Sequence, residues 1–308
     1  FYRSNNVSIH QLSKCDPELV DFYFFSSVHW VDVKYVSKSV IMIMDTLPLD
    51  LKLHFPEVDI REWSGPFKEY AQKSKSIVTI SDWSAKRISE NLDITPEKIL
   101  VIPPGINHYI LSPVNTASCQ NFSPYVVFVG SDDFHKNIDV ILEAFGTDKL
   151  GNIKLVLVGD NKSALKRYGK KGNTENIIYL GKISDKEIKE VIRNAKALLC
   201  PSLAEGFGLP PLEAALLGVP CICSNRPAIN QILENAAIFI DPADVNVWVS
   251  QIKRVVFDAE FCSPMVLKAK AIAKKLTWEN FLNRLLNHLL STKTNKVDVK
   301  SRSNYADQ

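Results

Sequence analysis

The sequence predicts an α/β protein with two doubly wound domains, and three observations support this fold class. Apolar strand-like segments alternate with amphipathic helical segments along much of the chain. Glycine and small polar residues follow many of the strand-like segments, where turns into helices are expected. The 308 residues, 46% of them hydrophobic, suffice for two domains with a core each.

The alternation is clearest in the second half, which we interpret as one domain spanning residues 124–276. Strands are predicted at 125–129, 153–158, 176–180, 197–200, 219–223 and 237–240. Helices are predicted at 136–145, 185–195, 211–217 and 243–257. Parallel strands joined by helices form a sheet whose ligands lie at the carboxyl ends of the strands. Gly130, Gly181 and Ser202 are expected at such ends.

The first half, residues 1–107, is predicted to form a second unit of the same type. Strands are expected at 21–25, 40–44, 77–80 and 99–102, with helices near 66–74 and 82–91. The stretch 108–123 is rich in Ser, Asn and Pro and is the expected interdomain linker. Residues 277–290 are expected to form a final helix, and 291–308 a mobile polar tail.

The segment 205–218 has the features of an anion-binding turn followed by a helix. Gly206 and Gly208 flank Phe207, so the backbone can turn tightly and a ligand can approach it closely. The Pro-Pro pair at 210–211 suits the first turn of a helix, and Gly218 suits its C-terminal end. Free N–H groups at such a helix start favour a phosphate.

Two carboxylates, Glu205 and Glu213, stand eight positions apart in this segment. Carboxylates repel phosphate, so beside one they are better suited to bind sugar hydroxyls. The alternative interpretation is that Glu213 complements the helix dipole and that Glu205 is a solvated loop charge.

The whole segment resembles the donor-site signature of the GT-B-fold retaining glycosyltransferases of family GT4, the glycosyl transferases group 1. In that signature seven residues separate two glutamates. The resemblance implies two Rossmann-like domains, with residues 1–107 on the acceptor side and the nucleotide-sugar site in residues 124–276. It implies that Glu205 contacts hydroxyls of the donor sugar and that Glu213 binds the nucleotide ribose. It further implies that the backbone after Glu205 meets the sugar and phosphates, at Gly206, Phe207, Gly208 and Leu209.

A second motif lies around Lys136. A lysine at a helix start is unfavourable unless an anion lies nearby, although a solvated surface lysine is the alternative. The run Val-Phe-Val-Gly, ending at Gly130, with His-Lys-Asn at 135–137, resembles the family motif whose lysine binds the donor diphosphate. By this resemblance Lys136 neutralises the leaving group. Ser131 stands where some members have arginine and His135 where many do, so phosphate binding would depend on fewer cations.

One further motif of this chain resembles the family pattern, and two features depart from it. The turn 181–183 resembles the family's nucleobase-facing turn, which makes Gly181 and Ile183 candidate contacts. Ile-Met-Asp-Thr at 43–46 aligns with a strand end that commonly reads His-Asp, whose histidine helps to position the donor sugar. Met44 cannot do so, and Asp45 remains a candidate active-site residue or a turn cap. The family's usual first strand and glycine-rich loop are not found, so we expect an incomplete N-terminal domain.

Charge and cysteine content restrict the partners. A net charge of +3 without long single-sign blocks argues against nucleic acid. Lys68, Lys73 and Lys75 could contact an anionic membrane surface, but a solvated helix face is the interpretation that we favour. Six scattered cysteines, several within apolar strands, indicate reduced thiols in a cytoplasmic protein, with inner-face membrane association as an option. No zinc-type spacing is found, so no metal is expected.

By this resemblance we expect a retaining, metal-independent glycosyltransferase of polysaccharide biosynthesis. The resemblance implies transfer of a hexose, with mannose as one candidate, from a GDP- or UDP-linked donor to a saccharide or lipid-linked acceptor, without any cofactor. One alternative is a nucleotide-sugar-binding partner subunit with no activity of its own. The other is a GT-B-fold nucleotide-sugar epimerase, which would need no acceptor. The sequence does not indicate an oligomeric state.

Overall fold

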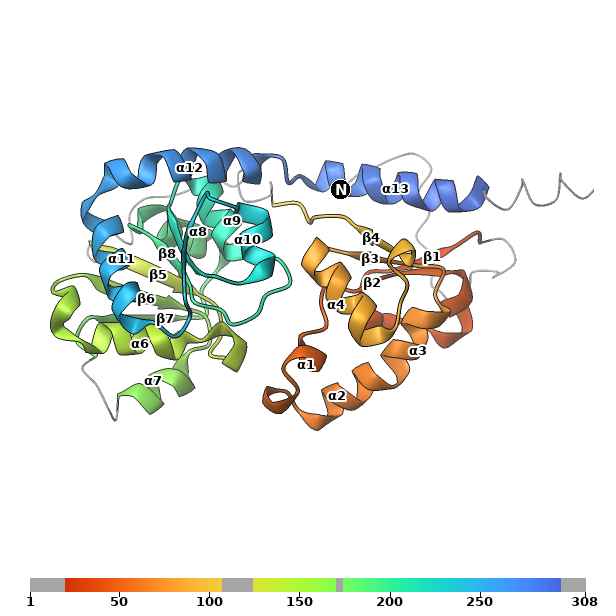
Figure 1. The fold of residues 1–308 in the computed structure, drawn as a ribbon, viewed down its shortest axis with the longest axis horizontal. Helices are drawn as coiled ribbons and strands as arrows, with labels where there is room; N and C mark the ends of the chain where they lie inside the picture. The colour runs from red at the N-terminus through yellow and green to blue at the C-terminus, as the bar shows by residue number, and fades with distance from the viewer. Residues whose placement is uncertain (1–19, 107–123, 170–173, 295–308) are drawn as a thin grey trace, which may run out of the picture.

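The computed structural model describes residues 20–106, 124–169 and 174–294, and it confirms an α/β fold with two parallel sheets (Figure 1). The expected linker 108–123 lies outside the described residues. Most of the expected tail, residues 295–308, also lies outside the described residues. Residues 291–294 continue the last helix, so the prediction that the tail starts at 291 is wrong.

The first domain has a four-stranded sheet in which the strands follow one another in chain order. The strands are β1 (Tyr23–Phe25), β2 (Ser39–Met42), β3 (Ser76–Thr79) and β4 (Ile99–Val101). The helices are η2 (Val28–Trp30), η3 (Val33–Lys38), α1 (Leu47–Asp50), η4 (Lys52–His54), α2 (Glu57–Ser64), α3 (Pro66–Lys73), α4 (Asp82–Leu92) and η5 (Pro96–Lys98). Right-handed crossovers that always advance in one direction place their helices on the same face of a sheet.

That face carries the larger core of the first domain, in which Trp63, Phe67 and Leu92 of the helices pack on Ile41 and Ile77. The opposite face is covered from the far end of the chain. Helix α13 (Trp278–Thr294) buries side chains on Val40, Val78 and Ile102, which are fully buried. The α13 side chains in this contact are Phe281, Leu285 and Leu289.

The second domain has a six-stranded parallel sheet in the order β10-β9-β8-β5-β6-β7. The strands are β5 (Tyr125–Val129), β6 (Lys154–Val158), β7 (Ile177–Gly181), β8 (Leu198–Cys200), β9 (Cys221–Ser224) and β10 (Ile238–Ile240). The chain winds outward through β6 and β7, then returns to β8 and winds the other way. The direction therefore reverses between β5 and β8, and such a switch point is where doubly wound sheets bind ligands.

Helices cover both faces of this sheet (Figure 1). They are η7 (Phe134–Lys136), α6 (Ile138–Gly146), η8 (Asp148–Leu150), α7 (Lys162–Tyr168), α8 (Asp185–Asn194), α9 (Leu209–Leu217), α10 (Pro227–Leu233), α11 (Val245–Phe257) and α12 (Ala259–Lys274). One core packs α9 and the end of α12 on the sheet, and the other packs α6 and α11.

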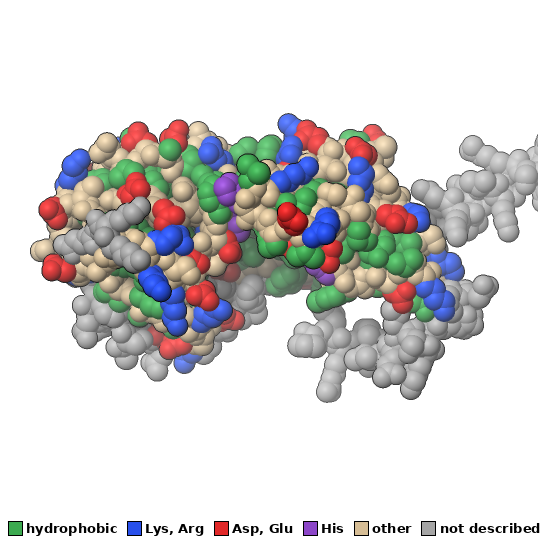
Figure 2. Space-filling model, turned by 90° about the horizontal axis from the view of Figure 1, so that it is seen from below, with side chains coloured by type: hydrophobic (Ala, Val, Ile, Leu, Met, Phe, Trp, Pro, Cys, Tyr) green, Lys and Arg blue, Asp and Glu red, His purple; other side chains and the backbone are tan. Residues whose placement is uncertain are grey.

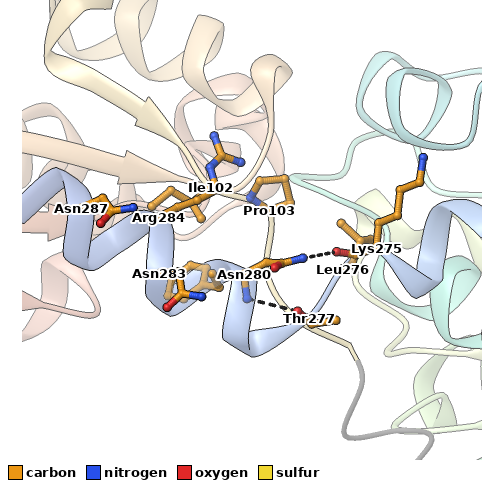
Figure 3. Close-up of a pocket in the computed structure, with 10 residues that line it drawn as sticks. Ile102, Pro103, Lys275, Leu276, Thr277, Asn280, Asn283, Arg284 and Asn287 are labelled. Atoms are coloured by element: carbon orange, nitrogen blue, oxygen red, sulfur yellow. Dashed lines mark hydrogen bonds between the residues drawn. The ribbon is translucent and has the colours of Figure 1, made fainter.

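Two chain segments join the domains at a hinge. The stretch after β4 lies against the segment between α12 and α13, where the Ile106 N–H donates to the Leu276 carbonyl at 3.0 Å. A Cβ at Gly105 would lie 2.2 Å from the Trp278 nitrogen, so only glycine fits there. Figure 3 shows this hinge, with the Asn280 side chain donating to the Lys275 carbonyl at 3.0 Å.

Several predictions about composition can be compared with the described residues. Cys200, Cys221, Cys223 and Cys262 are free and buried. Among the described residues no helix is long and apolar enough to cross a membrane, and no cluster of three or more His, Cys, Asp or Glu side chains could hold a metal ion. On α3 and nearby, Lys68 pairs with Asp93 and Lys73 with Glu69. These ion pairs favour a solvated helix face, and membrane contact remains a prediction.

Candidate active site

The candidate site forms at the switch point, where the loops after β5 and β8 lie side by side. Lys136 ends η7, after β5, and Glu205 lies between β8 and α9. The Lys136 Nζ donates to Glu205 Oε1 at 2.7 Å. The lysine and glutamate side chains are only 23% and 11% exposed, so this ion pair is well shielded from water.

The local backbone around Lys136 differs from the sequence prediction. A helix was expected to run from Lys136 to Phe145, but Lys136 belongs to a 3-10 turn and α6 begins at Ile138. Asn137 separates the two in the left-handed conformation, with φ of 52°, which asparagine tolerates well. Its side-chain amide donates to the carbonyls of Pro201 and Pro242 at 3.1 and 3.0 Å, and so anchors the Lys136 turn to the loop after β8.

Ser202 is a contributor that the sequence pattern placed at a strand end but gave no role. Its side chain is buried, and its hydroxyl donates to Glu205 Oε1 at 2.7 Å, the oxygen that Lys136 also contacts. Among the described contacts, Glu205 Oε2 accepts no hydrogen bond. One carboxylate oxygen is therefore fixed by two donors, and the other can serve a ligand.

The turn after Glu205 presents backbone amides. Gly208 has a φ of 105°, a conformation that favours glycine, and helix α9 starts at the next residue, two residues earlier than expected. The Phe207 side chain is buried in the core at 4% exposure, which holds the turn in place. Among the described residues, no hydrogen bond uses the N–H groups of Phe207, Gly208 or Leu209. Pro210 and Pro211 supply no N–H, so within residues 207–211 these three amides are the ones available.

Asp45 lies in the first domain, directly opposite this turn. A Cβ at Gly206 would be 2.9 Å from Asp45 Oδ2, so these two segments of the chain approach closely here. Burial raises the pKa of Asp45; the Leu47 N–H, which donates to Oδ1 at 3.1 Å, opposes the rise, and the charge of Glu205 adds to it. The surroundings of Asp45 therefore disfavour additional negative charge.

The first domain also holds the turn through hydrogen bonds. Ser81 and Ser84, at the start of α4, donate through their hydroxyls to the Gly206 carbonyl at 2.7 and 3.1 Å. Ring contacts add to this closure, because His54 stacks on Phe134 and Phe55 lies near His135. In Figure 2 histidine and apolar side chains gather at the boundary between the two lobes.

The remaining predicted residues lie at varying distances from this centre. Gly130 borders it, since a Cβ there would lie 3.9 Å from Lys136 Cδ. Glu213 is half-buried on α9, beyond its first turn, so a simple dipole role is not what the structure shows. Gly181 and Ile183 lie at the end of β7, two strands from β5, and no described contact joins them to Lys136 or Glu205. Their proposed roles stay predictions.

Two α/β domains face each other in this protein, and the sheet of the second has a switch point of the kind at which doubly wound sheets bind nucleotides. This arrangement is that of the GT-B class of glycosyltransferases. Residues 120–272 match the family model described as "Glycosyl transferases group 1". The second domain is therefore a domain of the glycosyl transferases group 1 family.

Two curated relatives illustrate the match. The chain is 26% identical over 249 residues to the O-antigen chain mannosyltransferase B of Escherichia coli, covering 76% of this chain and 65% of that protein. It is 27% identical over 191 residues to the O-antigen chain mannosyltransferase RfbU of Salmonella typhimurium, covering 61% and 53%. The chain thus spans less than two thirds of the length of these relatives.

Solved structures share the fold. WaaG, a glycosyltransferase involved in lipopolysaccharide biosynthesis, has a TM-score of 0.67 at 16% identity, covering 88% of this chain and 78% of that one. Anabaena Alr3699/HepE in complex with UDP-glucose has a TM-score of 0.65 at 18% identity, covering 82% and 72%.

Proposed function

We propose that the chain is a retaining, metal-independent hexosyltransferase that uses a GDP- or UDP-linked sugar and a saccharide or glycolipid acceptor. One observation carries the proposal. The free amides of residues 207–209, the ammonium of Lys136 and the carboxylate of Glu205 come together at the switch point of the second domain. The relatives named as O-antigen mannosyltransferases make mannose the proposed hexose.

The amides and Lys136 suit the diphosphate of the donor. When the bond between the anomeric carbon and the phosphate breaks, negative charge grows on the leaving phosphate oxygen. Donors that are already in place stabilise that charge without reorganisation. Because prolines remove two amides of the first turn of α9, Lys136 carries a larger share of this work than in a helix start with all its N–H groups.

Glu205 suits the sugar. Lys136 and Ser202 both hold Oε1, so the carboxylate keeps its orientation when the lysine also contacts phosphate. We assign to Oε2 a hydrogen bond from a hydroxyl of the donor sugar, which fixes the anomeric carbon for attack. With Glu205 engaged in this way, we assign no side chain as a covalent nucleophile. We propose instead that the acceptor attacks from the face that the phosphate leaves.

Two alternatives remain. A partner subunit without activity is favoured by Met44, which is 52% exposed and stands where the family commonly has a histidine. An epimerase would convert the donor with no acceptor present. Incubation of the protein with donor alone distinguishes these outcomes, because an epimerase changes the sugar and a binding subunit changes nothing.

The first test is a thermal-shift screen with UDP-, GDP- and ADP-sugars, because a tight donor raises the apparent stability by mass action. The second compares the wild type with Glu205→Ala. We expect transfer to be abolished while the folded structure and nucleoside diphosphate binding are retained. Wild-type turnover in Glu205→Ala would disprove the central assignment.

A further inference from the structure

A second feature of the cleft is a cavity of about 290 Å³ on the side of the first domain. It lies between the end of β2, helix α1 and the α2 region, and reaches His135 of the second domain. The residues that matter for its chemistry are His29, Met44, Asp45, Phe55, Trp63 and His135. The volume is at the small end of ligand pockets, enough for one end of a molecule and not for a long chain.

The walls are mainly apolar and aromatic. Trp63 and Phe55 contribute rings, and His29 lies near Trp63 with ring centroids 6.4 Å apart. The face of an aromatic ring carries partial negative charge, which attracts the C–H groups on one face of a pyranose ring. Met44 adds a flexible apolar surface that adapts to irregular shapes. These walls suit the ring of a sugar.

The charges of the cavity do not suit a phosphate. None of the described lining residues is a lysine or an arginine, the side chains that usually bind phosphate. Burial, reinforced by the charge of Lys136, lowers the pKa of His135, so its ring is uncharged near neutral pH. The neighbouring ammonium of Lys136 is held by Glu205 on the donor side. A phosphate here would add negative charge beside Asp45, whose surroundings already oppose it.

Asp45 lies where the cavity meets the donor turn, because it lines the cavity and touches Gly206. A hydroxyl that donates to an Asp45 oxygen would therefore lie next to the proposed position of the donor sugar. We propose that this cavity binds the uncharged terminal sugar of the acceptor, so that the chain extends a glycan and does not start one on a phosphate. This inference rests on the proposed function.

In this reaction the oxygen of the acceptor hydroxyl forms a bond to the anomeric carbon of the donor. The bond from that carbon to the diphosphate oxygen breaks, and the proton passes to the departing diphosphate. Asp45 accepts a hydrogen bond from a neighbouring hydroxyl of the same acceptor sugar and so orients the attacking oxygen. The substrate must then come from an earlier transferase that attaches the first sugar to its carrier.

The experiment measures nucleoside diphosphate release by the protein with GDP-mannose or UDP-glucose. One arm adds a panel of methyl hexosides and neutral disaccharides, and the other adds polyprenyl phosphate. We expect neutral sugars to raise release above the acceptor-free rate and polyprenyl phosphate to leave it unchanged. Stimulation by polyprenyl phosphate, or by neither class, overturns the inference. Failure of the proposed function is a different result, in which no nucleotide sugar binds or is turned over.

Two variants test the cavity itself. Asp45→Asn should reduce transfer to a neutral acceptor about 10- to 100-fold, chiefly through a higher acceptor KM, with an unchanged Kd for nucleoside diphosphate. Glu57→Gln removes an exposed carboxylate of the same domain and should retain wild-type transfer. Met44→Arg places a cation in the cavity without disturbing the core, because Met44 is half exposed. Met44→Arg should weaken binding of the neutral acceptor and make inorganic phosphate an inhibitor. Unchanged kinetics in both Asp45→Asn and Met44→Arg would refute the assignment.

Discussion

The ion pair between Lys136 and Glu205 permits a sharp test by Lys136→Met, which keeps the length of the side chain and removes its charge. Exposed ion pairs contribute about 0–1 kcal/mol, whereas breaking a fully buried pair costs about 3–5 kcal/mol. The Lys136 and Glu205 side chains are 23% and 11% exposed and their atoms lie 2.7 Å apart, so the cost lies between these limits. We expect about 2 kcal/mol, because Glu205 keeps the Ser202 hydroxyl as a donor.

For a domain of this size, about 1 kcal/mol corresponds to about 2–4 °C in Tm, so Lys136→Met should lower the Tm by about 4–8 °C. The double variant Lys136→Met/Glu205→Gln should recover most of this loss, because the amide carries no charge to leave unpaired. It should not recover turnover, because both the charge on phosphate and the sugar contact are gone. Calorimetry and a turnover assay on the three proteins measure both effects.

The pH for these measurements follows from the direction in which the folded protein shifts the pKa of Lys136. Burial alone would lower the pKa of Lys136, but the charge and the hydrogen bond of Glu205 outweigh it and raise the pKa above the ordinary 10.5. A raised lysine pKa means that its stabilising contribution is complete below 10.5 and is lost only as the pH rises through the folded-state value. Measurements at pH 7–8 therefore record the whole effect. A Lys136→Met protein as stable as the wild type would refute the reasoning.

Three further predictions concern neighbouring residues. Ser202→Ala should lower turnover about 10-fold with an unchanged Kd for nucleoside diphosphate, and Ser202→Thr should retain activity; equal loss in both variants would argue for a purely structural role. Asp45→Asn should raise stability near pH 7 by about 0.5–2 kcal/mol. Because the folded protein raises the pKa of the Asp45 carboxyl, the free energy of unfolding falls as the pH rises above 3.8, and the uncharged amide avoids this loss. A lower Tm in Asp45→Asn would contradict this. Gly208→Ala should destabilise by about 1–3 kcal/mol, and by more than Gly218→Ala: both positions have positive φ, but only at 208 would the new Cβ lie 3.2 Å from Ile229.

The second domain was predictable because each of its elements is recorded locally in the sequence. Strands such as β5 and β6 are short apolar runs that end in glycine, and their alternation with helices fixes a parallel sheet. From that topology, Lys136 and Glu205 are expected on neighbouring loops even though 69 positions separate them. Their direct ion pair is a matter of side-chain geometry, which periodicity does not contain.

The contacts across the cleft could not be predicted for the same reason. Ser81 lies 125 positions from Gly206, and only the folded arrangement shows that its hydroxyl reaches the Gly206 carbonyl. Local conformation was a second limit. The αL backbone of Asn137 delays α6 by two residues, and that of Gly208 lets α9 start earlier, because cap geometry is weakly encoded in single residues.

The position of α13 has a consequence for how the protein is made. The first domain needs three side chains of α13 to cover one face of its sheet: Phe281, Leu285 and Leu289. This helix comes late in the chain. Its Arg284, which donates a hydrogen bond to the Val101 carbonyl, lies 183 positions after Val101. Domains usually fold as they emerge, at about 5–20 residues per second. The uncovered sheet face would therefore wait about 10–40 s on the ribosome for its last layer, during which the second domain can fold independently.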